Sequence, residues 1–360
     1  MRGKDFIMTP RIFGAPHLYI QGPGTLKRLP ELVSGLGDRA FVVADPFVAE
    51  RYGPRLAGLL GPSVAIAAFG GECTAAEIDR MAGMAETHGA NVIVGMGGGK
   101  AIDTAKGVQI RLGGRIVIVP TIASNDSPTS RLSVIYREDH ALSEVRLMTS
   151  NPDVVLVDSK VIVEAPVRFF LAGVGDALSK KYEAAQCRKS GGRNFYNGTQ
   201  TECAGAIAAH CDVVLRRDAI AAAADVRAQR ITPEVESVIE AAILLSGLSF
   251  ENGGLSIAHS LGRGFSVIPA MQAFLHGEQV GFGTLVQLAM TADADAERQA
   301  FSALLSELGL PRRLSDFGGT GQDAQKIAET TMATAPYIRN FERSVTASSI
   351  TEAMMSLEKD

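Results

Sequence analysis

The chain has 360 residues, of which 46% are hydrophobic and 21% charged, and its formal net charge is −4. This length predicts about two domains, and the composition excludes a disordered chain and a coiled coil. The acidic balance argues against nucleic-acid partners, and no apolar run reaches the roughly 18 residues of a membrane span. The four cysteines lack Cys-x-x-Cys spacing, so we expect reduced thiols in a cytoplasmic protein without membrane partners.

Short apolar runs alternate with helical patterns over the first 165 residues. Five runs have the continuous apolar character of strands buried on both faces: 40–44, 64–69, 92–96, 116–119 and 154–157. Helical patterns separate the first four runs at 46–60, 74–88 and 101–112. This α/β alternation predicts a doubly wound parallel sheet. Two alternating runs around a polar turn predict a β-hairpin over 132–148.

The pattern changes near Pro166. Beyond it, β-branched runs become rare and alanine-rich periodic segments follow, for example at 199–217 and 233–250. These segments predict an all-helical second domain. We therefore divide the chain into an N-terminal α/β domain (1–165) and a C-terminal helical domain (166–360), with no flexible linker between them.

A glycine-rich segment follows the strand predicted at 92–96. Gly95, Gly97, Gly98 and Gly99 lie within five positions, and glycine lets a backbone approach a ligand closely. The N–H groups at the start of the next helix suit a pyrophosphate. The pattern is neither a G-x-G-x-x-G fingerprint nor a P-loop, because Ala101 stands where a P-loop has Ser or Thr. At the carboxyl end of a central strand, it favours a nucleotide site over a plain turn.

Two further strand ends carry polar residues. Asp45 follows the strand at 40–44, where a carboxylate binds an adenosine ribose and repels a 2′-phosphate, which favours NAD over NADP. A surface turn before Pro46 is the alternative. The segment 121–130 (TIASNDSPTS) is crowded with hydroxyls, and Asp126 is its one acid. Its position beside the glycine segment favours ligand contact over turn chemistry alone.

Asp176, His259 and His276 each lie in a glycine-framed segment of the helical region. The glycines and the proline between the two histidines prevent one continuous helix, so the histidines can face one site from neighbouring helices. One aspartate and two histidines can hold a catalytic metal with an open position for substrate. Spacing alone leaves unrelated structural residues as the alternative.

Five segments together resemble the glycerol dehydrogenases of the metal-dependent (iron-containing type) alcohol dehydrogenase superfamily. They are GMGGGKAIDTAK, PTIASNDSPTSRLSVIY, GVGDALSKKYEA, FENGGLSIAHSLGRGF and LHGEQVGFGTLVQL, and FGGEC agrees as well. The resemblance covers nearly the whole chain in the family's order and spacing. It implies a dehydroquinate synthase-like fold, an active site in the cleft between two domains, and a homo-oligomer, often an octamer.

The resemblance also implies roles for single residues. It implies a divalent metal, usually Zn²⁺ with Fe²⁺ as an alternative, bound by Asp176, His259 and His276. Asp126 corresponds to the aspartate that faces the substrate hydroxyls near the nicotinamide. The implied cofactor is NAD, and the residues that correspond to its binding site are Asp45, Gly98, Gly99, Lys100, Ala101, Ile102, Asp103, Thr121, Ser124, Ser130, Leu132 and Tyr136.

The chain departs from the family's pattern in two places. It has Gly-Arg-Gly at 262–264 where the family commonly has H-N-G, and PAMQAFLH at 269–276 where the family has P-D-A-H-H-Y-Y-H. The second change makes the residues beside His276 less polar, so Phe274 becomes a candidate for contact with an apolar part of the substrate. Arg263 can hold a substrate carboxylate in a bidentate pair, or it is an exposed cation at a helix end.

We therefore predict NAD-dependent, metal-assisted oxidation of a secondary hydroxyl in a small polyol, such as glycerol to dihydroxyacetone, or in a related vicinal diol. The predicted catalytic residues are Asp126, Asp176, His259 and His276. One alternative keeps this site but makes the substrate a 2-hydroxy acid, or in reverse a 2-oxo acid, held by Arg263. Another, of a different class, is a non-catalytic nucleotide-binding protein.

Overall fold

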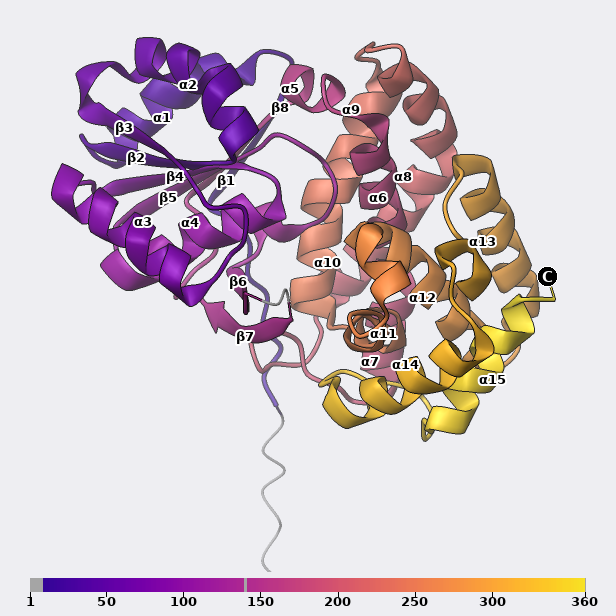
Figure 1. Ribbon diagram of the computed structural model, residues 1–360. Coiled ribbons are helices and arrows are strands. Elements are labelled where there is room, and N and C mark those ends of the chain that lie inside the picture. The colour runs from indigo at the N-terminus through magenta and orange to yellow at the C-terminus, as the bar shows by residue number, and fades with distance from the viewer. Residues whose placement is uncertain (1–8, 139–140, 360) are drawn as a thin grey trace, which may run out of the picture.

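The computed structural model describes residues 9–138 and 141–359. A sheet flanked by helices lies beside a large group of packed helices (Figure 1). The architecture changes between α5 (Ser159–Val163) and α6 (Val167–Ala177). Ile118 and Ile162 of the first region belong to the same hydrophobic cluster as Val174 and Ile239 of the second. The two regions therefore share a core.

Six parallel strands form the sheet in the order β1-β8-β5-β4-β2-β3. They are β1 (Leu18–Gly22), β2 (Ala40–Ala44), β3 (Val64–Ala68), β4 (Val92–Gly97), β5 (Arg115–Pro120) and β8 (Val154–Asp158). Strands β2, β4 and β8 are buried along their whole length, which explains their continuous apolar runs. The doubly wound parallel sheet is confirmed. The sequence pattern did not reveal β1 because this edge strand is only partly buried and carries polar residues.

Helices cover both faces of the sheet (Figure 1). They are α1 (Leu29–Leu36), α2 (Pro46–Leu60), α3 (Ala75–His88) and α4 (Gly99–Leu112). Alternate side chains of β2 point to opposite faces, so Phe41 joins the core with α3 and α4, whereas Val42 joins the core with α1 and α2. Helix α4 begins at Gly99, two residues before the predicted start, because the end of the glycine segment forms its first turn.

The predicted hairpin forms from β6 (Leu132–Tyr136) and β7 (Leu142–Leu147), which pair antiparallel. Residues 139 and 140, in its predicted turn, lie outside the described residues. The Ser133 hydroxyl donates a 2.8 Å hydrogen bond to the carbonyl of Asp103. The hairpin is thereby attached to α4, directly behind the glycine segment.

The remaining described chain is helical. Its elements are α6, α7 (Lys180–Lys189), α8 (Glu202–Arg227), α9 (Pro233–Glu240), a π-helical turn (Ala241–Leu245), α10 (Ser246–Gly253), α11 (Ile257–Phe265), α12 (His276–Met290), α13 (Asp295–Leu308), α14 (Gly321–Thr334) and α15 (Ala347–Leu357). The helix predicted at 199–217 thus starts later and extends to Arg227, and the one predicted at 233–250 is interrupted by the π-helical turn. Within the described chain, no single helix is long and apolar enough to cross a membrane, and only the pair 233–253 and 257–265, bent by 98°, meets those requirements together.

Candidate metal and cofactor site

The glycine segment and the hydroxyl-rich segment lie side by side at the carboxyl ends of β4 and β5. The N–H of Thr121 donates a 3.1 Å hydrogen bond to the carbonyl of Gly97. A Cβ on Gly99 would lie 2.9 Å from the Asn125 side-chain nitrogen, so the two segments are in close contact. Gly97 has φ 157°, a conformation that favours glycine, and it ends β4 just before the helix. This geometry leaves the start of α4 available to a pyrophosphate.

Asp45 follows β2 at the same edge of the sheet. Its carboxylate accepts the N–H of Phe47 at 3.0 Å and caps α2, and a Cβ on Gly97 would lie 3.4 Å from the Asp45 Cβ. Lys100 pairs with Glu72 at 2.7 Å, and its ammonium lies 5.6 Å from the ring centroid of Tyr136. These predicted cofactor residues therefore surround the glycine segment from three elements.

Most of the other predicted cofactor residues are buried. Ala101, Ile102 and Thr121 are buried, and Ser124 is partly exposed. Buried Lys106 donates to the Ser130 hydroxyl at 3.2 Å and to the carbonyl of Leu132 at 2.8 Å. Such residues shape the loop or offer backbone groups.

Asp103, on α4, is also buried and only 6% exposed. Burial outweighs the attraction of the Lys106 ammonium and raises the pKa of Asp103 to about 7. One of its carboxylate oxygens has no hydrogen-bond partner among the described residues.

The predicted metal ligands meet at a single point in the helical region. Asp176 comes from α6, His259 from α11 and His276 from the start of α12, and one ligand atom of each lies within 4.8 Å of the others. The Asp176 Oδ1 is 3.2 Å from the His259 Nε2 and 4.0 Å from the His276 Nε2. Asp176 is fully buried, whereas the His276 side chain is 49% exposed. The cluster is therefore closed on one side and accessible on the other.

Glycines permit the close contact of α6 and α12 that brings these ligands together. A Cβ on Gly175 would lie 2.5 Å from the carbonyl oxygen of Gly277, and a Cβ on Gly277 would overlap the carbonyl of Ala172. Larger residues at either position would separate Asp176 from His276. The glycine-framed segments in the sequence are thus a packing requirement of the cluster.

Glu183 on α7 holds His259 in place. Its carboxylate accepts the backbone N–H groups of Ser256 at 2.9 Å and His259 at 3.0 Å, and it pairs with the His259 Nδ1. This contact directs the Nε2 toward Asp176, as the partner of a metal-binding histidine does. Burial lowers the pKa of His259, but the carboxylates of Glu183 and Asp176 outweigh burial and raise it to about 9. Glu183 was not among the predicted site residues.

Lys180, on α7, is a second residue that the sequence reasoning missed. Its Nζ lies 2.7 Å from the Asp176 Oδ1, 2.9 Å from the Asp126 Oδ2 and 3.1 Å from the His259 Nε2. Burial alone would raise the pKa of Asp176, but the Lys180 ammonium and His259 outweigh it and hold that pKa well below its usual range. The available signal was the four-residue spacing of Asp176 and Lys180, which would place them on one face of a continuous helix. The structure ends α6 at Ala177 but keeps the contact.

The three predicted ligands fit a divalent metal. A carboxylate and two imidazoles are a donor set that zinc accepts. Within the part of the chain that the structure describes, the buried Asp176 Oδ2 has no hydrogen-bond partner. Ligand atoms bound at about 2.1 Å lie no more than about 4.2 Å apart, so a small movement of the partly exposed His276 would complete the site.

Residues 16–159 match the sequence profile of a family described as iron-containing alcohol dehydrogenase. A glycerol dehydrogenase from Thermotoga maritima is 37% identical over 98% of this chain and 98% of its own. A glycolaldehyde reductase from Halobacterium salinarum is 37% identical over 97% of both chains. The solved structure of a probable glycerol dehydrogenase from Sinorhizobium meliloti has a TM-score of 0.92 and 39% identity, and covers 97% of this chain and 98% of that one.

The chain belongs to the iron-containing alcohol dehydrogenase family. It is an oxidoreductase, and the resemblance to glycerol dehydrogenases is confirmed. The family depends on NAD and on a metal, which agrees with the glycine segment and with the cluster of Asp176, His259 and His276.

Arg263 and Phe274 lie at the two departures from the family pattern. Arg263 follows His259 by one turn on the same face of α11, and its guanidinium interacts electrostatically with Tyr136 and Tyr337. Within residues 9–138 and 141–359 no ion pair links it to a carboxylate. Phe274 packs against Phe317, with ring centroids 4.6 Å apart, so its substrate contact stays a prediction.

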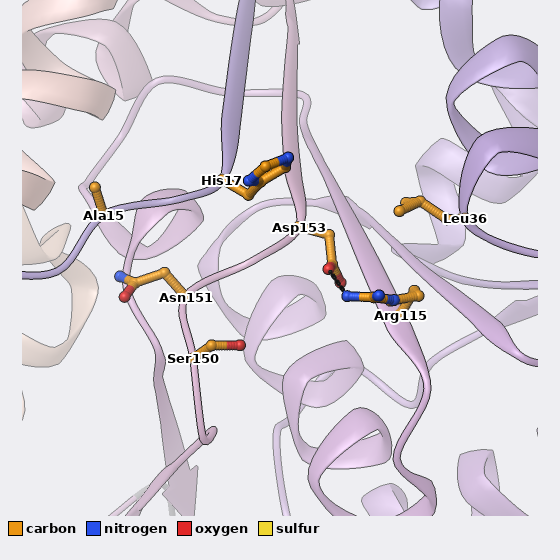
Figure 2. A pocket seen from close by; sticks show the side chains of 7 residues that line it. All are labelled: Ala15, His17, Leu36, Arg115, Ser150, Asn151 and Asp153. Atoms are coloured by element: carbon orange, nitrogen blue, oxygen red, sulfur yellow. Dashed lines mark hydrogen bonds and ion pairs between the residues drawn. The ribbon is translucent and has the colours of Figure 1, made fainter.

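A cavity of about 460 Å³ is lined by residues that do not belong to the cluster of Asp176, His259 and His276 (Figure 2). Its lining includes His17, Arg115 and Asp153, which precede or begin β1, β5 and β8. It is therefore at the amino ends of the strands, opposite to the edge where ligands of doubly wound sheets bind. Arg115 and Asp153 neutralise each other at 2.8 Å, so the cavity offers no unpaired charge from this pair.

Proposed function

We propose that this oxidoreductase uses NAD and a divalent metal, zinc in preference to iron, to oxidise a secondary hydroxyl of glycerol or a related vicinal diol. The observation that carries the proposal is the convergence of Asp176, His259 and His276 beside Asp126. Asp126 belongs to the segment 121–130, which contacts the glycine segment, so the metal cluster and the glycine segment lie next to each other. In this proposal, 1–165 is the cofactor domain and 166–360 the metal and substrate domain.

The protein's own residues have separate tasks in this reaction. Asp176, His259 and His276 would hold the metal, and Glu183 keeps the His259 Nε2 directed at it. When bound, the metal supplies Lewis acidity that lowers the pKa of the substrate hydroxyl. The backbone N–H groups at the start of α4 would hold the pyrophosphate of NAD, which would supply the hydride acceptor.

Asp126 would orient the second hydroxyl of the diol. The Ser246 hydroxyl lies 3.2 Å from its Oδ2, and Lys180 lies 2.9 Å from the same oxygen. These two partners fix the carboxylate and leave its other oxygen to accept a hydrogen bond. Substrates with a single hydroxyl would lose this contact.

Initial rates of NADH formation with glycerol and zinc test the proposal. We expect turnover in the wild type, loss of most activity in His276→Ala, and unchanged activity in His210→Ala, which alters an exposed histidine of the same region. Folded Asp176→Ala and His259→Ala proteins with full activity would contradict the metal assignment. Tight NADH binding without turnover of any alcohol would instead favour the non-catalytic alternative.

Arg263 supports a second candidate function, oxidation of a 2-hydroxy acid at the same metal site. Its guanidinium has no carboxylate partner in the described chain and lies one helical turn from His259. A bidentate pair with the substrate carboxylate would satisfy it. This function would be selected if the wild type turned over 2-hydroxybutyrate faster than glycerol. The preference for 2-hydroxybutyrate should be lost in Arg263→Ala and kept in Arg339→Ala. Arg339 is an exposed arginine of the same region.

A further inference from the structure

Lys180 lies inside the cluster of proposed metal ligands. Its side chain is 0% exposed, and its ammonium contacts Asp126, Asp176 and His259 at 2.9, 2.7 and 3.1 Å. The contact with Asp176 is a hydrogen bond donated by Lys180, and the contact with Asp126 is an ion pair.

The ammonium uses the same atoms that the metal would use. The Asp176 Oδ1 and the His259 Nε2 are 3.2 Å apart, and Nζ is within hydrogen-bonding reach of both. A zinc ion about 2.1 Å from each of them would lie within about 4 Å of Nζ, whichever side of the pair it approached. A dication and a monocation that close repel each other strongly in a buried site.

We propose that Lys180 is a built-in competitor of the divalent metal. In the metal-free protein its ammonium occupies the Asp176–His259 position, and it withdraws toward Asp126 when the metal binds. The proposal rests on the metal site of the proposed function, but it concerns binding of the metal and is separable from turnover.

The contacts of Asp126 make it the acceptor for the displaced ammonium. Its Oδ2 already lies 2.9 Å from Nζ, and Ser246 holds the same carboxylate from α10. Lys180 can therefore give up two contacts and keep the third. Asp126 belongs to the segment 121–130 beside the glycine segment. The ion pair that remains between Lys180 and Asp126 therefore links this segment to the metal-bound site.

The competition also explains how the cluster tolerates the absence of a metal. Asp176 and Glu183 are both fully buried, and buried carboxylates without a cation are strongly unfavourable. In the metal-free protein Lys180 supplies that cation beside Asp176, and His259 pairs with Glu183. The consequence is a preformed site whose affinity for metal is lower than its ligands alone would provide.

The proposal is tested by measuring the zinc affinity of chelator-treated protein. The measurement is made at one pH, by competition with a chromophoric chelator. The Lys180→Met variant keeps the length of the side chain and removes its charge. We expect it to bind zinc at least about 30-fold more tightly than the wild type does. Coulomb repulsion between a dication and a monocation about 4 Å apart gives this factor even in bulk water. Lys181→Met is the matched control, because Lys181 is partly exposed and pairs with Asp212 at 2.9 Å. It should bind zinc as the wild type does.

Equal or weaker zinc binding by folded Lys180→Met overturns the proposal, as does the absence of zinc binding by both proteins. Crystal structures of the wild type with and without zinc give a second measurement that needs no variant. We expect the contact between the Lys180 Nζ and the His259 Nε2 to be lost in the zinc form, and its persistence beside bound zinc overturns the proposal. Neither measurement depends on turnover, so failure of the proposed function would appear separately as zinc binding without NADH formation.

Discussion

The contact of α6 with α12 controls the distance between two proposed metal ligands, and Gly175→Ala perturbs it directly. The new Cβ would lie 2.5 Å from the carbonyl oxygen of Gly277, about 1 Å closer than ordinary van der Waals contact. Both atoms are held by helix backbone, so α12 must move away by about that amount. His276 would then lie about 5 Å from the Asp176 Oδ1, whereas ligands at about 2.1 Å from one zinc span at most about 4.2 Å.

Gly281→Ala is the matched control on α12. Its Cβ would have no neighbour closer than 3.6 Å, and it gains the same helix propensity of about 1 kcal/mol. Chemical denaturation should therefore show Gly175→Ala about 1–3 kcal/mol less stable than Gly281→Ala, the usual cost of overpacking. Zinc titration should show affinity lowered at least tenfold in Gly175→Ala alone. Equal stability and equal zinc affinity in the two variants would refute the argument that glycine packing sets the ligand distance.

Two further predictions concern buried carboxylates. Glu183→Gln should lower zinc affinity about 10- to 100-fold, because the amide has one acceptor oxygen and cannot accept both the backbone N–H groups and the His259 Nδ1–H. The equally buried Glu251→Gln should leave zinc affinity unchanged. Equal zinc affinities of the two variants would contradict the role of Glu183. For Asp103, burial raises the pKa from 3.8 in the unfolded chain to about 7. A group whose pKa is higher in the folded protein than in the unfolded chain stabilises the folded protein at pH values below its unfolded pKa. This stability is lost as the pH rises through the folded pKa. Between about pH 4 and pH 7, the unfolding free energy of the wild type should therefore fall by up to about 4 kcal/mol relative to Asp103→Asn, and parallel profiles from urea denaturation would contradict this.

Local sequence patterns were sufficient for most of the α/β region. The runs at 40–44, 92–96 and 154–157 are buried on both faces, so their apolar character is continuous and easy to read. The edge strand β1 carries Gln21, whose amide donates to Glu236 of α9. No local pattern reveals a strand whose polar residue is satisfied by a distant helix.

The ligand set was accessible because each ligand lies in a segment that resembles a known family. Lys180 and Glu183 stand in one of the same segments, GVGDALSKKYEA, but their roles depend on contacts with Asp126 and His259. Those contacts exist only after α7 has packed against α11 and the loop after β5. The oligomeric state and the cellular location stay predictions from the sequence.

The sequence by itself determined most of the strand–helix alternation in the α/β region and the glycine segment, because periodicity and local motifs are encoded over a few neighbouring residues. It indicated the proposed ligands because their segments resemble a known family. Only the tertiary structure decided that Lys180 shares the position of the metal and that Glu183 orients His259. The physical reason is that a buried charge is stable only beside its partners, and here the partners come from α6, α11 and the loop after β5. Their meeting depends on helix contacts as close as that of Gly175 with Gly277.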